Sequence, residues 1–344
     1  MSRMPTGDVG SRAWGVVLGA LWAAAIGGCG APPAQVPELT ADPPTGATVS
    51  AGSAATELQR GIAHVKQERY ADAKPHFERA WELDPSHPEV AFYLGLVKAE
   101  TGDVAGAESS YREALKLDPK FVEAAENLSA LYLSEPARPD EAITILSEGL
   151  KSAPDNARLM QNLALAYAMK GDIAGAAKQY EAALAKGDDV KLRFAYGSFL
   201  FEAKQYEKAA EQLKKVLEVT ADDDVTMLAT LGLLLGQSRA FGDRVKAYDR
   251  ALKVKSEAER FVRRGRCKHE LKDKAGARAD YEAAVKVDPQ FAAAHYYLGL
   301  ALLEDRKPNS ALTEFDKAAR LGGSSPIGKL AKEKFDVITA EKQR

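Results

Sequence analysis

Five histidines and one interior cysteine are the side chains in this sequence best suited to bind a transition metal. No two histidines have the i, i+4 spacing with an intervening glutamate that marks a zinc-protease helix; they are His64, His76, His87, His269 and His295. Cys267 and His269 form a C-x-H pair, whereas a metal site needs three or four converging ligands. We therefore predict no metal site, and we expect His64 and Cys267 to be packed in the core.

Two further motifs could bind phosphate or a cation. Gly323-x4-Gly328-Lys329 superficially resembles a phosphate-binding loop, but Leu330 stands where Ser or Thr would bind magnesium, and a helix rather than a strand precedes it. The Asp222-Asp223-Asp224 run lacks the spaced oxygen ligands of a calcium loop. The sequence contains no Ser-His-Asp elbow. We predict that the protein is not an enzyme, has no cofactor and takes no small-molecule substrate.

Composition and charge narrow the remaining classes of function. The chain has 344 residues, of which 46% are hydrophobic and 28% are charged, so it is neither disordered nor a polytopic membrane protein. Lys and Arg total 47 against 49 Asp and Glu, for a formal net charge of −2. A dedicated nucleic-acid binder normally shows a strong basic excess, and we therefore expect no nucleic-acid partner.

Residues 1–28 have the features of a secretory signal peptide. Arg3 and Arg12 precede an uncharged apolar stretch over residues 13–26. As a helix this stretch is roughly 21 Å long, too short for the ~30 Å hydrocarbon core of a membrane. It ends in Ile26-Gly27-Gly28-Cys29, which resembles the bacterial lipoprotein box with its lipidated cysteine. An ordinary secretory signal that happens to contain a cysteine is the alternative.

Cys29 is thus the expected lipid attachment site of an exported, membrane-anchored protein. Gly30 rather than Asp follows it, and by resemblance to the enterobacterial sorting rule this favours the periplasmic face of the outer membrane. Residues 29–53 are rich in Pro, Gly, Ala, Ser and Thr and have no periodic apolar face. Such a segment cannot bury enough surface to offset its ordering entropy, and we expect a flexible linker.

Beyond the linker, two series of mostly small residues recur in the same phase at intervals of 33–35 residues. The first series is Gly61, Gly95, Ser129, Ala164, Gly197, Gly232, Gly265 and Gly299. The second series is Ala80, Ala114, Gly149, Ala183, Val216, Ala251, Ala284 and Ala318. Because the two series keep the same period through eight members, we predict eight copies of one structural unit.

The repeated unit resembles the tetratricopeptide repeat family, whose pattern is W-x2-L-G-x2-Y, then A-x3-F, then Pro. The second repeat shows it most clearly, in Leu94-Gly95, Ala107, Tyr111, Ala114 and Pro119. The resemblance covers residues 54–323 and implies an all-α, right-handed superhelical solenoid of helix-turn-helix repeats. We expect these repeats at about 54–87, 88–121, 122–156, 157–189, 190–224, 225–257, 258–291 and 292–323.

Each repeat is expected to be two antiparallel helices joined by a turn such as Gly102-Asp103 or Gly171-Asp172. Large residues of the second helix, such as Tyr111, are expected to fill the space between successive hairpins. Arg244 stands where the sixth repeat should have a small residue, and this predicts an irregular repeat. Residues 324–344 are expected to form a helix that caps the apolar end of the array.

In the tetratricopeptide family the concave groove is lined by six positions of each opening helix. Transferred residue by residue, the resemblance implies a partner-binding surface of Phe92, Tyr93, Leu96, Asn127, Asn162, Leu165, Phe194, Phe201, Arg263, Arg266, His269, Tyr296, Tyr297 and Leu300. Aromatic anchors, amides and bases together suit an extended peptide. The alternative for the aromatic residues is packing between adjacent helices. Cytoplasmic chaperone adaptors of this family bind a carboxylate with Lys and Asn side chains on neighbouring opening helices. The ninth position of each repeat is never Asn in this sequence, so this carboxylate clamp is absent.

We therefore expect a non-catalytic scaffold lipoprotein of the bacterial cell envelope that binds a protein or an extended peptide. It is similar to the tetratricopeptide lipoproteins that serve type IV pilus secretin assembly, outer-membrane barrel assembly or the regulation of cell-wall hydrolases. The alternative function is an accessory subunit that presents substrate to a cell-wall or glycan-processing enzyme.

Overall fold

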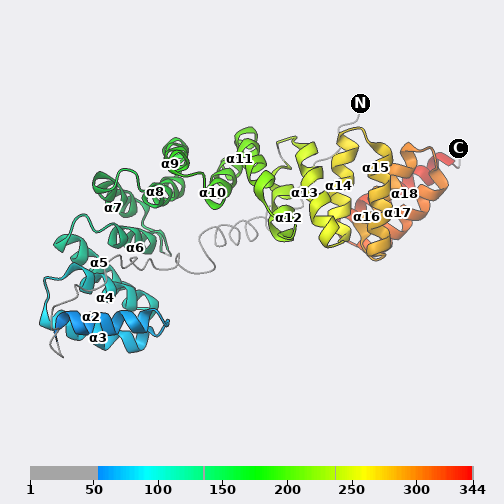
Figure 1. Cartoon of the computed structure of the whole chain (residues 1–344). Coiled ribbons are helices and arrows are strands. Elements are labelled where there is room, and N and C mark those ends of the chain that lie inside the picture. Colours follow the sequence, from blue (N-terminus) through cyan, green and yellow to red (C-terminus); the bar gives the residue numbers. More distant parts are fainter. Residues whose placement is uncertain (1–52, 135, 237, 343–344) are drawn as a thin grey trace. The chain divides into compact units, whose positions relative to one another are not determined.

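The computed structural model describes residues 53–134, 136–236 and 238–342, which contain seventeen helices and no strands. The predicted signal peptide, Cys29 and almost all of the linker lie outside the described residues. The chain divides into two compact units, with the boundary between Leu192 and Arg193 at the beginning of α10. Each unit is a stack of helical hairpins (Figure 1), and the predicted all-α tetratricopeptide solenoid is confirmed.

Residues 53–192 contain four hairpins, each made of an opening and a closing helix. The pairs are α2 (Ala54–Val65) with α3 (Tyr70–Leu83), α4 (Pro88–Glu100) with α5 (Val104–Leu117), α6 (Val122–Leu133) with α7 (Pro139–Ser152), and α8 (Ala157–Lys170) with α9 (Ile173–Lys186). One continuous apolar core runs from Leu58 to Ala166 through these pairs. A single hairpin cannot bury its own apolar face, and stacking on its neighbours does so.

Residues 193–342 contain most of α10 and the helices of the remaining hairpins in the same order. The helices are α10 (Val190–Glu202), α11 (Tyr206–Val219), α12 (Val225–Leu234), α13 (Phe241–Val254), α14 (Ala258–Glu270), α15 (Lys274–Val287), α16 (Ala292–Glu304), α17 (Pro308–Gly322) and α18 (Pro326–Lys342). The sixth repeat is irregular as predicted, because its opening helix α12 has only ten residues. Arg244 Nε donates to the carbonyl oxygen of Gly232 in that helix at 2.9 Å.

The turns inside the hairpins need a residue with left-handed backbone geometry. Gly102 and Gly171 have φ values of 87° and 82°, a region that glycine enters without steric cost. The next residue, Asp103 or Asp172, accepts a hydrogen bond from a free N–H of the closing helix at 2.9 Å. Five other hairpin turns place a non-glycine residue at positive φ, namely Glu68, Lys204, Arg239, Lys272 and Arg306.

Glycine in the opening helix is required by a ring from the closing helix of the same hairpin. A Cβ on Gly95 would lie 2.6 Å from Cδ1 of Tyr111, and one on Gly61 would lie 2.5 Å from Cε1 of Phe77. The prediction that these rings lie between successive hairpins is therefore incomplete. Phe77 contacts the glycine of its own hairpin and also stacks on Tyr93 of the next, with centroids 5.1 Å apart.

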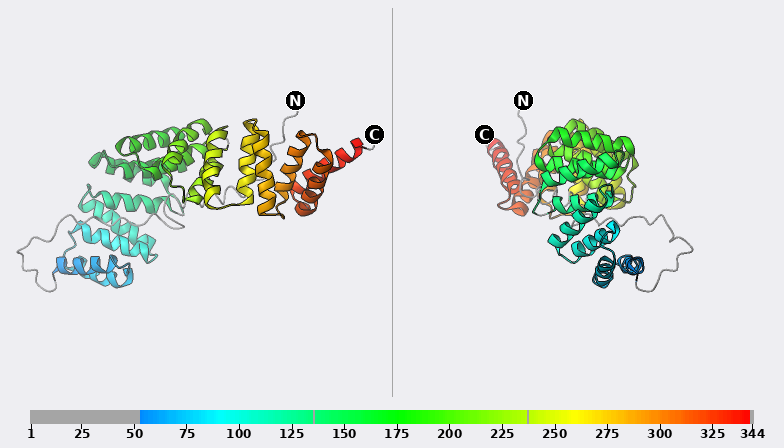
Figure 2. Two further views of the ribbon diagram at one scale, coloured as in Figure 1. Left: turned by 45° about the vertical axis from the view of Figure 1, so that its right-hand side comes forward. Right: turned by 90° about the vertical axis from the view of Figure 1, so that its left-hand side faces the viewer.

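Helix α18 covers the open end of the last hairpin, which confirms the predicted capping helix. Ala331 and Ile338 of α18 join a buried cluster with Tyr296 and Phe315, and the orange and red helices lie side by side in both views of Figure 2. A Cβ on Gly328 would lie 2.5 Å from the carbonyl oxygen of Gly323. Gly328 of the phosphate-loop-like motif therefore permits close approach of α18 to the end of α17, whereas Gly323 supplies a positive φ of 50° in the turn between them.

Candidate functional site

The opening helices carry the predicted partner-binding residues, and the structure places half of these residues in the core. Phe92, Tyr93 and Leu96 of α4 are almost completely buried. The Phe92 ring lies 5.1 Å from Phe121 and 5.8 Å from Tyr111 between ring centroids. The expectation that the three α4 side chains form an exposed surface is wrong, because the hairpins on both sides pack against them. Tyr93 stacks on Phe77 of the preceding hairpin, and Phe92 contacts the following one. Consensus spacing identifies the face but not how closely the next repeat covers it.

Four more of the predicted residues are also buried. The Asn127 side chain is hydrogen-bonded to the Tyr111 hydroxyl, and Phe201 packs edge-on against Tyr206 with centroids 5.4 Å apart. Phe194 and Tyr296 are likewise in the interior. The prediction that these four residues are accessible is therefore also wrong. The alternative, in which aromatic residues pack between adjacent helices, describes the three aromatic residues better.

The accessible members of the predicted set lie on three helices. They are Asn162 and Leu165 on α8, Arg263, Arg266 and His269 on α14, and Tyr297 and Leu300 on α16. Asn162 and Leu165 belong to residues 53–192, and the other five gather in residues 193–342. We refer to Arg263, Arg266, His269, Tyr297 and Leu300 as the α14–α16 surface.

Arg266 is the centre of the α14–α16 surface. Its side chain is exposed, and its guanidinium carbon lies 5.2 Å from the centroid of the Tyr297 ring, within range of a cation–π contact. Arg266 forms no ion pair with any residue that the structure describes. By contrast, Arg263 donates to Glu259, with Nε 3.0 Å from Oε1, and His269 Nε2 lies 2.8 Å from Glu304 Oε1. Arg266 is thus available to an external carboxylate.

A buried ionic network on the other side of α14 fixes the orientation of this helix. Arg264 Nε donates to Asp280 Oδ2 of α15 at 2.9 Å, and its NH1 donates to Asp249 Oδ1 of α13 at 2.7 Å. Burial alone would lower the pKa of Arg264, but the hydrogen bond and charge of Asp280, with Asp249, outweigh burial and raise it. Arg264 therefore stays charged, and Arg263 and Arg266 are held on the opposite side of the helix.

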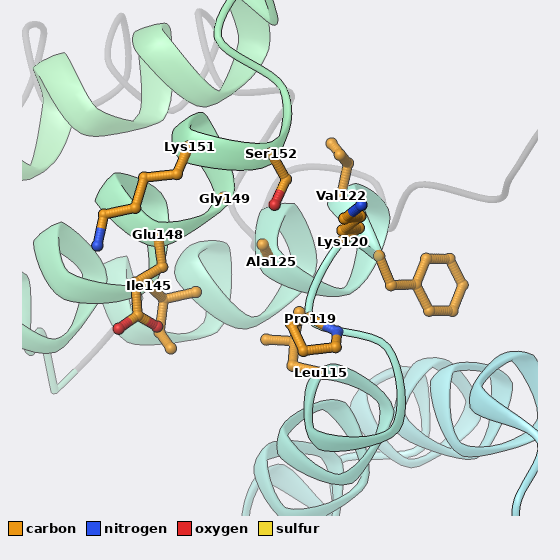
Figure 3. Close-up of a pocket in the computed structure, with 11 residues that line it drawn as sticks. Leu115, Pro119, Lys120, Val122, Ala125, Ile145, Glu148, Gly149, Lys151 and Ser152 are labelled. Atoms are coloured by element: carbon orange, nitrogen blue, oxygen red, sulfur yellow. The ribbon is translucent and has the colours of Figure 1, made fainter.

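A pocket of about 400 Å³ opens on another side of residues 53–192. Figure 3 shows its lining contributed by α7 on one side and by α5, the following turn and the beginning of α6 on the other. Its apolar lining includes Leu115, Pro119, Phe121, Val122, Ala125 and Ile145, and its polar residues include Lys120, Glu148 and Lys151. None of the predicted groove residues lines this pocket, whereas Pro119 and Gly149, which the repeat pattern singles out, both do.

The residues suspected of other chemistry have structural roles. Cys267 is buried, its thiol donates to the Arg263 carbonyl oxygen at 3.1 Å, and burial raises its pKa. Asp224 caps α12 by accepting from the Met227 N–H at 2.9 Å. The described residues contain no group of three or more His, Cys, Asp or Glu side chains that could hold a metal ion.

His64 and His76 belong to the two helices of the first hairpin, whereas His269 and His295 lie in later hairpins. His295 is buried, with Nδ1 2.6 Å from Glu314 and Nε2 2.9 Å from the Pro289 carbonyl oxygen. His64 is half-buried and stacks on His76 with centroids 5.3 Å apart. No helix among the described residues combines the length and apolar character that crossing a membrane requires.

Comparison with known proteins identifies the repeated unit. A tetratricopeptide repeat model matches residues 58–120, 170–224 and 262–326, and a second tetratricopeptide repeat model matches residues 98–164. The TPR repeat-containing protein YpiA of Bacillus subtilis is 30% identical over 151 residues, which is 44% of this chain and 36% of that protein. The peroxisomal targeting signal receptor of Saccharomyces cerevisiae is 26% identical over 196 residues, covering 54% of this chain and 32% of the receptor.

This chain spans about a third of the length of these two relatives. Among solved structures, a thermophilic TPR protein of Thermus thermophilus aligns with a TM-score of 0.43 and 23% identity. The alignment covers 53% of this chain and 98% of that protein.

Proposed function

Because this chain belongs to the tetratricopeptide repeat family, we propose that it is a non-catalytic scaffold that binds an extended segment of a partner protein on the α14–α16 surface. Proteins of this family are generally scaffolds for protein–protein interaction. One relative is named as a receptor for a targeting signal, and a peptide-like ligand for this chain accords with that name. The observation that carries the proposal is the exposed Arg266 stacked beside Tyr297 without an ion-pair partner among the described residues.

The chemistry of the α14–α16 surface suits a segment in which an acidic residue neighbours an apolar one. The planar guanidinium of Arg266 can form two parallel hydrogen bonds with a carboxylate, and its contact with Tyr297 holds the plane in place. Tyr297 and Leu300 are only half-buried and can cover an apolar side chain. Arg263 is paired with Glu259, and the His269 ring contacts Glu304, so Arg266 is the cation of this surface that has no acidic partner among the described residues.

We place the proposed scaffold at the periplasmic face of the outer membrane, anchored by acyl chains on Cys29. The support is the apolar stretch followed by Ile26-Gly27-Gly28-Cys29, and Gly30 after the cysteine. This location favours a role in assembling an envelope complex such as a type IV pilus secretin. Accessory presentation of substrate to a cell-wall or glycan-processing enzyme is the alternative.

A photo-crosslinking amino acid at Leu300 tests the partner-binding proposal in intact cells. We expect it to capture a discrete protein, and we expect Arg266→Ala to abolish that adduct without lowering the melting temperature. The same amino acid at Lys286, on the exposed side of the closing helix α15, is the matched control and should give no such adduct. Capture at both positions alike, or capture that Arg266→Ala leaves intact, would contradict the proposal. Secretin or barrel components among the captured proteins favour scaffolding, whereas a hydrolase or synthase favours the accessory role.

Replacing Cys29, the proposed lipid attachment site, tests the proposed membrane location. We expect Cys29→Ser to release the protein from the membrane fraction and to remove incorporation of labelled palmitate, because both depend on the acylated thiol. Cys267→Ser, which removes the buried thiol, is the control and should leave labelling unchanged. Palmitate labelling of the Cys29→Ser protein at the parental level would overturn the proposed attachment site.

A further inference from the structure

The pocket of about 400 Å³ lined by α5, α6 and α7 has an apolar floor and two lysines at its rim. We refer to it as the α5–α7 pocket. Lys120 and Lys151 lie on opposite walls (Figure 3), and both side chains are exposed. Neither ammonium takes part in an ion pair with another residue that the structure describes. An apolar cavity between two such cations suits an apolar side chain that has acidic neighbours.

A glycine in α7 helps to keep the pocket open. Gly149 is the one glycine of the second small-residue series, whose other members are alanine or valine. A Cβ on Gly149 would lie 3.2 Å from Leu159 Cδ1 and 3.4 Å from Ala125 Cβ. Ala125 lines the pocket, so the methyl group that other repeats carry would take up space at its base.

The fifth and sixth hairpins show a side chain bridging the corresponding pair of closing helices. Arg250 of α13 donates from NH1 to the Leu217 carbonyl oxygen of α11 at 2.6 Å. Glu148 and Leu115 hold the same two repeat positions in α7 and α5. A carboxylate has no hydrogen to donate, so Glu148 cannot make this contact. The α5–α7 pocket is therefore left open to a side chain from outside these helices.

One stretch of the sequence before α2 has the complementary character. Residues 30–52 contain two acidic residues and no Lys or Arg. Both acids, Glu38 and Asp42, stand close to Leu39, and Pro37 and Pro43 bracket the stretch. Proline restricts φ, which reduces the conformational entropy that an extended segment loses on binding. Residues 37–42 thus carry one large apolar side chain between two negative charges.

The chain is long enough to bring Leu39 to the pocket. Ser53 caps the beginning of α2, and Val122 at the beginning of α6 lines the pocket. At about 10 Å between packed neighbours, the four helix steps from α2 to α6 amount to at most ~40 Å. The 14 residues from Leu39 to Ser53 can extend to about 50 Å.

We propose that residues 37–42 dock onto the α5–α7 pocket, with the Leu39 side chain on its apolar floor and the two carboxylates at Lys120 and Lys151. Glu148 is the one acidic lining residue, so the rim keeps a net positive charge. Docking leaves only the residues from Cys29 to Pro37 between the lipid anchor and the first four hairpins, and release lets these hairpins move further from the membrane. This consequence rests on the lipid attachment proposed above, whereas the docking itself does not.

The experiment places a photoreactive diazirine analogue of leucine at position 39 of the full chain. We expect an intramolecular adduct with residues 115–125 or 145–152, mapped by digestion and mass spectrometry. The double variant Glu38→Lys, Asp42→Lys should lower the adduct yield at least ~3-fold, as should Lys120→Glu, Lys151→Glu, because attraction becomes repulsion. Combining all four substitutions should restore the yield, since the two sides again carry opposite charges.

The same analogue at Val49, an apolar residue without acidic neighbours, is the matched control and should not label the pocket. Lys116→Glu is the charge control, because Lys116 is exposed on α5, outside the lining, and lies 3.0 Å from Glu113. It should leave the yield unchanged. The proposal is overturned if Lys116→Glu lowers the yield as much as the double variants, if the combined variant does not recover it, or if the adducts join two copies of the chain.

The yield in the Cys29→Ser background separates this proposal from the proposed anchor. We expect it to equal the parental yield, because docking needs no acyl chain. Failure of lipid attachment would then leave the adduct intact, and failure of docking would leave palmitate labelling intact. Loss of the adduct in Cys29→Ser would overturn docking through the pocket and the lysines alone.

Discussion

Glycine at the centre of an opening helix fixes how closely the two helices of a hairpin approach. In five separate hairpins the glycine faces a phenylalanine or tyrosine ring, at Gly61, Gly95, Gly232, Gly265 and Gly299. Glycine in a helix interior costs about 1 kcal/mol relative to alanine, and the burial of a large ring offsets that cost. The small-residue series in the sequence therefore has a direct steric cause.

Adding a single methyl group at Gly95 should destabilise the second hairpin. The new Cβ would lie 2.6 Å from Tyr111, and because Tyr111 is itself almost completely buried, the ring can move only by opening the core. We expect Gly95→Ala to lower the free energy of unfolding by about 1–3 kcal/mol, measured by urea denaturation. Gly187→Ala, where no atom lies within 4 Å of the new Cβ, should change it by less than about 0.5 kcal/mol. Equal effects of the two substitutions would show that the contact with Tyr111 is not the cause.

At the scale of helices and turns, a carboxylate on α5 holds the end of the turn that leads into α7 of the third hairpin. Arg138, the last residue before α7, donates to Glu108 Oε2 at 2.5 Å, and the Tyr132 hydroxyl donates to Glu108 Oε1 at 3.1 Å. The Arg138 guanidinium also lies 4.3 Å from the centroid of the Tyr132 ring. The beginning of α7 is thus held to the preceding hairpin by an ion pair.

The Glu108 contacts should make stability depend on pH in the acid range. The hydrogen bond from Arg138 lowers the pKa of Glu108 in the folded protein, with further lowering by Tyr132 and Arg112. Its stabilising contribution is therefore complete above the ordinary Glu value of about 4.3 and is lost as the pH falls through the lowered folded value. We expect Glu108→Gln to be less stable than the parent at pH 7, with the difference narrowing below pH ~4 in parallel urea titrations. A difference that stays constant from pH 7 to pH 3 would contradict this origin.

The capping helix should be displaced by a substitution in its first turn, where it packs against the end of α17. A Cβ on Gly328 would lie 2.5 Å from the Gly323 carbonyl oxygen, and backbone cannot give way as a flexible side chain can. We expect Gly328→Ala to cost about 1–3 kcal/mol and to increase binding of a hydrophobic dye, since Ile338 and Tyr296 lose their cover. Gly242→Ala, which meets no atom within 4 Å, is the control. Unchanged dye binding by Gly328→Ala would show that α18 does not depend on this contact.

Across the whole molecule, the sequence predicts the repeated hairpins and the cap but not which residues of the opening helices are accessible. Periodic small residues record a local steric requirement that every repeat shares. Accessibility depends on how neighbouring hairpins overlap, which is why Phe92 and Leu96 are core residues while Tyr297 and Leu300 remain half-exposed.

An array of hairpins that contact only their neighbours should confine damage to the neighbourhood of a substitution. A Cβ on Gly299 would lie 2.8 Å from Phe315, so Gly299→Ala strains the contact between α16 and α17. We expect faster amide hydrogen exchange in α15, α16, α17 and α18, where local opening becomes easier, and parental exchange rates in α4 and α5. Gly95→Ala should give the reverse pattern in the same measurement. If either substitution accelerated exchange equally throughout the chain, the hairpins would unfold as one cooperative unit, and the nearest-neighbour description would be wrong.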